Sequence, residues 1–150
     1  MREGRAALGT GLKEFASRGV PQIIELSGFD YCMIDMEHGA FDLETIADLA
    51  GWFAATNVSP IVRIHKAFIH HIPLMLDQGI MGIQISGVDN AEEARAIVRE
   101  AKYPPLGSRG MSGMGPTRVT RATEIATRPN TPHGRTRTSS SARRSSRSRD

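Results

Sequence analysis

The feature that most constrains this chain is a regular alternation of short apolar segments with segments of helical spacing. Strands are expected at 29–35, 60–64 and 80–85, and helices at 43–55, 67–77 and 91–101. The connections between them are only a few residues long. Strands joined through helices in this way pair in parallel, and the helices pack on the sheet. The alternation therefore predicts an α/β fold.

An additional helix at 20–26, preceded by a short strand at 8–12, brings the count to about four β/α units. Two architectures accommodate them: an open doubly wound sheet, or the N-terminal half of a (β/α)8 TIM barrel. A complete barrel takes about 250 residues. The 150 residues of this chain are too few for one.

Residues at the expected helix ends support these boundaries. Asp42 and Asn90 are side chains of the kind that cap helix N-termini, because their oxygens accept backbone N–H groups. Gly28 and Gly79 follow helical segments, as glycine often does at a helix C-terminus. Asn57 is the expected stop for the helix that begins after Asp42.

The basic character of the chain comes from one segment. Residues 128–150 hold seven Arg and one Asp, a net charge of +6, although the whole chain carries +3. Residues 1–127 therefore carry −3. The 128–150 segment contains no Val, Ile, Leu or Phe, so it cannot supply a core strand, and we expect it to be disordered.

Composition also excludes several classes of protein. The single cysteine, Cys32, rules out an intrachain disulfide framework, and its apolar neighbours favour a place in the core. No apolar run approaches the roughly 18 residues of a membrane helix. The N-terminus has no signal-peptide pattern. We therefore expect a cytoplasmic protein without a membrane partner.

Three polar residues are candidates for chemistry. His38 follows the 29–35 strand in the stretch Ile-Asp-Met-Glu-His-Gly, Arg63 ends the next strand, and Asp77 lies just before the third. Ligands of α/β folds bind at the carboxyl ends of strands, and we expect the three residues to converge there. An Arg fork binds a carboxylate, and a His beside a carboxylate is a general base. The set suits proton abstraction from a carboxylate-bearing substrate.

Other histidines and methionines favour structural roles. His65, His70 and His71 have no carboxylate or cysteine at metal-ligand spacing, and the last two, being adjacent, point to different faces of a helix. Four methionines lie in apolar stretches and are expected in the core: Met33, Met36, Met75 and Met81.

Five segments, in order, resemble the HpcH/HpaI aldolase family. They read IDMEHG with FDLETIADL, PIVRI, LDQGIMGIQI, NAEEARAIVREAK and YPPLGSRGMSGMG. The resemblance implies a (β/α)8 barrel and a class II aldolase that cleaves a 4-hydroxy-2-oxo acid to pyruvate, or a related 2-oxo acid, and an aldehyde. It further implies a homo-oligomer and a divalent metal, Mg²⁺, Mn²⁺ or Co²⁺.

The resemblance also assigns roles. His38 corresponds to the family's base, Arg63 to the residue that holds the 2-oxo acid and steadies its enolate, and Asp77 to the carboxylate that pairs with the base. The sequence departs from the family in two respects. Ser86 replaces a usual proline, and the family's metal ligands, in Gln-Ile-Glu and Gly-x-x-Asp-Leu motifs, are missing.

The missing motif suggests an origin for the Arg/Ser-rich segment. Shifted by one nucleotide, codons for Arg143-Arg144-Ser145-Ser146 can encode Gln-Ile-Glu. We therefore interpret 1–127 as a partial aldolase barrel and 128–150 as an out-of-frame tail. The chain would then lack the metal ligands, and we expect it to be inactive.

Two alternatives remain. One is a small α/β binding module whose 128–150 arm contacts nucleic acid or an acidic partner. The other is a citrate-lyase-like enzyme that acts on an acyl-CoA. This alternative is disfavoured because no basic cluster before residue 128 could bind the phosphates of CoA.

Overall fold

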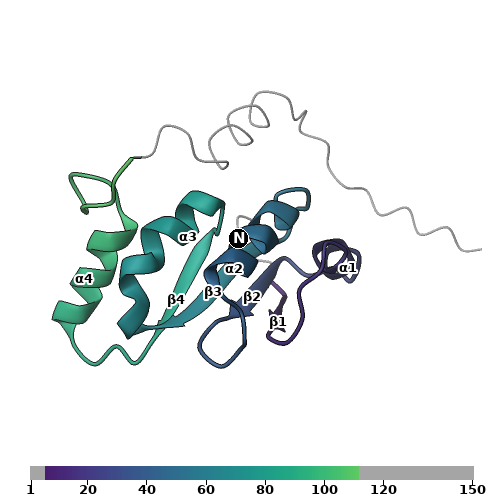
Figure 1. Ribbon diagram of the computed structural model, residues 1–150, viewed down its shortest axis with the longest axis horizontal. Helices are drawn as coiled ribbons and strands as arrows, with labels where there is room; N and C mark the ends of the chain where they lie inside the picture. The colour runs from purple at the N-terminus through teal and green to yellow at the C-terminus, as the bar shows by residue number, and fades with distance from the viewer. Residues whose placement is uncertain (1–5, 112–150) are drawn as a thin grey trace, which may run out of the picture.

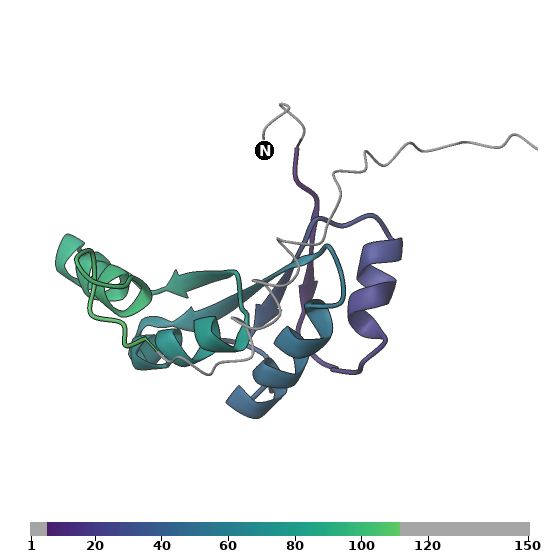
Figure 2. The same cartoon turned by 90° about the horizontal axis from the view of Figure 1, so that it is seen from above.

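A computed structural model describes residues 6–111, which form one parallel sheet with helices on one side (Figures 1 and 2). Strand and helix alternate along the chain: β1 (Gly9–Leu12), α1 (Val20–Leu26), β2 (Tyr31–Asp35), α2 (Leu43–Phe53), β3 (Ser59–His65), the 3₁₀ helix η1 (Lys66–His71), α3 (Ile72–Gln78), β4 (Gly82–Ser86) and α4 (Ala91–Ala101). The strands pair in the order β1-β2-β3-β4, and every pair is parallel.

This arrangement confirms the predicted α/β fold of four β/α units. In Figure 2 the helices follow one another around one face of the sheet, from α1 at one end to α4 at the other. Sequential parallel strands with all their helices on one face are the geometry of a (β/α)8 barrel rather than of a doubly wound sheet, which has helices on both faces. Residues 6–111 thus have the architecture of half a barrel.

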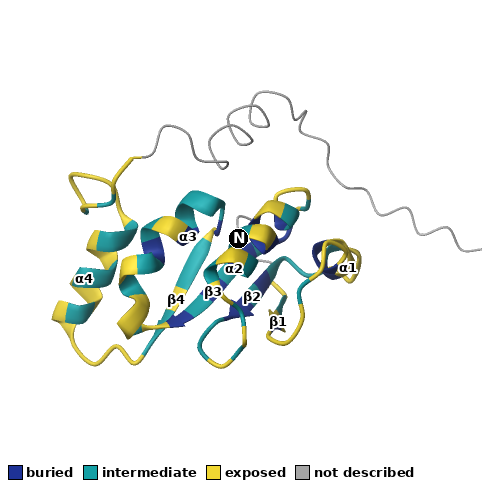
Figure 3. Ribbon diagram, in the orientation of Figure 1, coloured by how far each residue is buried: buried dark blue, intermediate teal, exposed yellow. Residues whose placement is uncertain are grey.

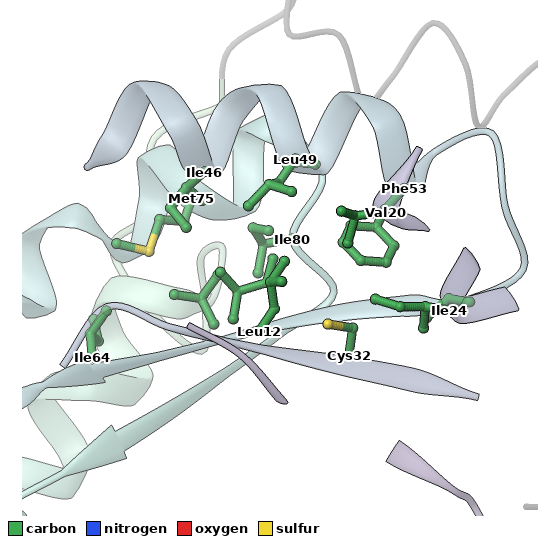
Figure 4. Close-up of a cluster of buried hydrophobic side chains, with 14 of the residues drawn as sticks. Leu12, Val20, Ile24, Cys32, Ile46, Leu49, Phe53, Ile64, Met75 and Ile80 are labelled. Atoms are coloured by element: carbon green, nitrogen blue, oxygen red, sulfur yellow. The ribbon is translucent and has the colours of Figure 1, made fainter. Parts of the chain in front are cut away.

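The core lies between the sheet and its helices (Figures 3 and 4). On the sheet side, the core consists of alternate residues of β2 and β3. These side chains are essentially inaccessible to solvent: Cys32, Ile34, Val62 and Ile64. The apolar face of α2 covers them with Ile46, Leu49, Ala50 and Phe53. Cys32 is fully buried, which confirms its expected place in the core, and this burial raises the pKa of its thiol to about 11.

Of the four methionines expected in the core, only Met75 is fully buried there. Met36 packs partly against the core. Met33 is half-buried on the other face of the sheet, and Met81 is 52% exposed.

Both predicted N-caps are confirmed. Asp42 Oδ1 accepts the backbone N–H of Thr45 at 2.8 Å, and Asn90 Oδ1 accepts that of Glu93 at 3.0 Å. Gly79 ends α3 with φ at +114°, a left-handed conformation that favours glycine.

The helix expected at 67–77 forms in two pieces. Pro73 has no N–H and its ring would clash with the carbonyl four residues earlier, so a regular α-helix begins only at Ile72. The preceding residues form η1, in which Phe68 leaves helical geometry with φ −106° and ψ +16°.

The strand residues that alternate with the core residues face the other side of the sheet. In β2 these are Tyr31, Met33 and Asp35, and in β3 they include Arg63 and His65. Because this face becomes the interior of a barrel, its residues near the strand carboxyl ends lie at the mouth.

Within residues 6–111, no helix is both long and apolar enough to cross a membrane. The segment 128–150, which is expected to be disordered and out of frame, lies outside the described residues.

Candidate active site

Asp35 organises the turn that follows β2. It is the last residue of the strand and is only 5% exposed. Its Oδ1 atom accepts the backbone N–H groups of Glu37 at 3.0 Å and of His38 at 3.2 Å. Asp35 therefore fixes the direction in which the chain leaves the strand, and with it the position of His38.

Arg63 of β3 pairs with Asp35 across the sheet. The two residues are register partners in the β2–β3 ladder. The Arg63 guanidinium donates from Nε to Oδ1 at 3.1 Å and from Nη2 to Oδ2 at 2.5 Å. Such a bidentate fork fixes the plane of the guanidinium as well as its position. The Arg63 side chain is 26% exposed, so it remains accessible from the mouth.

The pair is ionised over a wide pH range. Hydrogen bonds from Arg63 lower the pKa of Asp35 from 3.8 to about 2, and those from the backbone N–H groups of His38 and Glu37 act in the same direction. Asp35 in turn raises the pKa of Arg63. At neutral pH the mouth of the sheet therefore holds a carboxylate and a guanidinium in fixed contact.

Glu37 lies between Arg63 and His38. Its Oε2 atom is 3.6 Å from Arg63 Nε and 3.8 Å from His38 Nε2. The His38 side chain is 59% exposed. The structure thus brings two of the predicted residues, His38 and Arg63, to one edge of the sheet, and the carboxylate that stands beside His38 is Glu37.

Asp77 lies at the opposite edge. It is near the end of α3, and the chain then enters β4 from its amino end. There Met81 donates its N–H to the carbonyl of Pro60, at the start of β3, at 2.9 Å. A residue that directly precedes a parallel strand belongs to the amino edge of the sheet. Asp77 was expected near the carboxyl rim with His38, and the structure does not bring the two together.

At this amino edge Asp77 pairs with Arg109. The Arg109 guanidinium donates from Nη2 to Asp77 and lies 4.7 Å from the centre of the Tyr103 ring. Arg109 is 10% exposed. The segment that follows α4 is therefore held against the end of α3, on the side away from the β4–α4 connection (Figure 1).

The described residues offer few donors for a metal ion. Among residues 6–111, no three His, Cys, Asp or Glu side chains come together as a metal would need. Asp35, the most buried carboxylate of the mouth, is already engaged by Arg63 and two backbone N–H groups. The described residues do not fit a divalent metal on their own.

Sequence reasoning missed two residues of the site, Asp35 and Glu37, although both stand in the stretch it singled out. Asp35 and Arg63 lie near the carboxyl ends of neighbouring parallel strands and are register partners there. The sequence shows the opposite charges near both strand ends but not the register that pairs them.

Residues 16–134 match the sequence model of the HpcH/HpaI aldolase/citrate lyase family, which is more than half of the chain. This chain belongs to that family. The HpcH/HpaI match covers the described site and ends inside the 128–150 segment.

Relatives of known activity agree. The chain is 32% identical over 114 residues to a 2-dehydro-3,6-dideoxy-6-sulfogluconate aldolase of Pseudomonas putida. The aligned residues cover 76% of this chain and 44% of that protein. It is 35% identical over 107 residues to a hydroxypyruvate/pyruvate aldolase of Delftia acidovorans, spanning 71% of this chain and 39% of that one.

A solved HpcH/HpaI aldolase from Desulfitobacterium hafniense superimposes with a TM-score of 0.67 at 36% identity, over 75% of this chain and 43% of that chain. The chain thus spans less than half the length of these relatives. All three of these proteins are aldolases by name, and none of them is a nucleic-acid-binding module.

Proposed function

We propose that this chain provides the base and the 2-oxo-acid-binding residues of a carbon–carbon lyase that cleaves a 4-hydroxy-2-oxo acid to pyruvate and an aldehyde. The observation that carries the proposal is the bidentate pair of Asp35 with Arg63, which sets a guanidinium at the mouth beside His38. Aldolases of pyruvate and hydroxypyruvate among the relatives point to the same class of substrate.

Arg63 binds the 2-oxo acid in this proposal. A guanidinium has five N–H donors, and the bonds to Asp35 occupy two of them. The remaining donors suit the carboxylate and the 2-oxo group of pyruvate. As the carbon–carbon bond breaks, negative charge develops on the 2-oxo oxygen, and a fixed cation stabilises it without reorganising.

His38 acts as the general base. Its exposed imidazole takes the proton of the 4-hydroxyl group, the C3–C4 bond breaks to release the aldehyde, and the electron pair forms the pyruvate enolate. Protonation at C3 then yields pyruvate. The Glu37 carboxylate lies 3.8 Å from His38 Nε2 and so places an oxygen acceptor beside the imidazole.

The proposal assigns no step to Asp77 or to a metal. The role of Asp77 as the partner of His38 stays a prediction, and within one chain the two residues lie at opposite edges. A divalent metal would polarise the 2-oxo group in the whole enzyme. Because the described residues form no site for it, we assign no step to it.

Binding of pyruvate tests the proposal most simply. Calorimetric titration of the 150-residue chain with pyruvate should show binding that falls about tenfold or more in Arg63→Lys, since lysine keeps the charge but not the planar fork. Arg95→Lys, on the exposed face of α4, is the matched control and should bind as the wild type does. Equal binding in all three proteins would overturn the proposal.

A turnover assay tests the expected inactivity of the chain separately. With Mg²⁺ or Mn²⁺, the purified 150-residue chain should show no metal-dependent retro-aldol cleavage. Clear turnover that is lost in His38→Ala would show that this chain is active after all.

A further inference from the structure

We propose that His65 determines specificity by donating a hydrogen bond from Nε2 to a polar group on the aldehyde half of the substrate. The inference rests on the proposed function and adds to it a residue and a substrate preference. It starts from the position of His65, the last residue of β3, on the same strand as Arg63.

His65 and Arg63 face the same side of the sheet. Side chains alternate along a strand, and the buried residues Val62 and Ile64 take the core face. Two residues along a strand correspond to about 7 Å. A 4-hydroxy-2-oxo acid held by Arg63 is long enough to reach His65, which is exposed.

The His65 ring has a defined tautomer. Its Nδ1 atom accepts the backbone N–H of Ala67 at 3.2 Å and so caps the N-terminus of η1. When one ring nitrogen of a neutral imidazole accepts, the other carries the proton. Nε2–H of His65 is thus a donor whose orientation is fixed by the backbone.

The next connection lies against this donor. Gly87, which follows β4, has φ at +71°, and a Cβ atom built there would come within 2.9 Å of His65 Nε2. Any larger residue would crowd the nitrogen and would be strained in this conformation. Glycine at this position keeps the donor accessible.

A charge network holds the two connections in place. Lys66 Nζ donates to Asp89 Oδ2 at 2.5 Å and to Glu93 Oε1 at 2.9 Å, and Glu93 Oε2 accepts the Asp89 N–H at 2.9 Å. Lys66 follows His65, and Asp89 lies two residues beyond Gly87. The network therefore fixes the segment that carries the donor relative to the segment beside it.

A fixed N–H group prefers an acceptor oxygen over an alkyl group. An aldehyde half that ends in a hydroxyl or carboxylate satisfies it, whereas an alkyl end leaves it unpaired. We therefore expect 4-hydroxy-2-oxoglutarate, which ends in a carboxylate, to bind more tightly than 4-hydroxy-2-oxopentanoate, which ends in a methyl group. The preference should be roughly three- to tenfold, the value of one hydrogen bond.

Two variants separate the donor from the cap. His65→Asn keeps an acceptor near the Nδ1 position, and hence the cap on Ala67, but has no donor at the Nε2 position. His65→Gln reaches the Nε2 position with an amide N–H and loses the cap. Dissociation constants for pyruvate and for both hydroxy acids are measured by calorimetry on the full chain, together with the urea midpoint of each protein.

The proposal predicts that the preference disappears in His65→Asn and persists in His65→Gln, with pyruvate binding unchanged in both. A full preference in His65→Asn would overturn the role of His65 and leave the proposed function standing. No binding of pyruvate by the wild type would overturn the proposed function and this inference with it. The urea midpoint shows whether either variant is folded.

Discussion

Asp35 and Arg63, 28 positions apart in the sequence, form a bidentate pair across β2 and β3 at the carboxyl edge of the sheet. The same carboxylate also accepts the N–H groups of Glu37 and His38. One buried side chain thus positions both the guanidinium and the histidine of the proposed site.

Replacing Asp35 by Asn should destabilise the protein. The amide keeps one acceptor oxygen but loses the charge, and Arg63 is left partly buried without its counter-ion. We expect the free energy of unfolding, measured in urea, to fall by about 1–3 kcal/mol. Asp48→Asn, an exposed position of α2, should change it by less than about 0.5 kcal/mol. Equal effects would show that the pair adds little to stability.

Acid should weaken the fold through the same carboxylate. The pKa of Asp35 is lowered from 3.8 to about 2 in the folded state. Its contribution to stability is therefore complete above about pH 4 and is lost as the pH falls towards 2. The difference in unfolding free energy between wild type and Asp35→Asn should shrink by about 2 kcal/mol across that range. A difference independent of pH would contradict the assigned pKa.

Asp77 should act on the amino edge of the sheet. Asp77→Asn removes the carboxylate that neutralises Arg109, a residue with only 10% of its side chain exposed. We expect a loss of about 1–3 kcal/mol in unfolding free energy. The NMR chemical shifts of the His38 ring should not change in the folded variant. A shift of the His38 resonances would instead indicate that Asp77 reaches the base.

Two glycines should respond in opposite ways to alanine. A Cβ atom at Gly39 would lie 2.1 Å from the Asp35 carbonyl oxygen and 2.8 Å from that of Lys13, so the turn after β2 must shift. Gly39→Ala should cost about 1–3 kcal/mol or more. Gly51 lies inside α2 with nothing near its Cβ position, and Gly51→Ala should stabilise by about 0.5–1 kcal/mol. Thermal melts of both variants check the pair of outcomes.

Much of the fold could be predicted from local patterns. The alternation of apolar and helical segments, the caps at Asp42 and Asn90, and the left-handed turn at Gly79 are properties of neighbouring residues, and all are confirmed. The break before Ile72 was missed because helical periodicity continues through it, although Pro73 carries the signal.

The site was harder to predict, because it depends on register and direction. The pairing of Asp35 with Arg63 requires knowing which residues of β2 and β3 stand side by side, which no local pattern contains. Asp77 was expected with His38 because it lies close to a strand in sequence. The direction of the chain determines at which edge of the sheet a residue lies, however. Asp77 precedes β4 and therefore lies at the amino edge.

We propose that Arg63, held by Asp35, binds the 2-oxo acid, and NMR tests this role most directly. The Nε–H resonance of Arg63 is assigned by its absence in Arg63→Lys, and pyruvate is then titrated into the 150-residue chain. We expect a saturable shift of the Arg63 resonance and none of the Arg95 resonance. An Arg63 resonance that stays in place while pyruvate binds elsewhere, or does not bind, would contradict it.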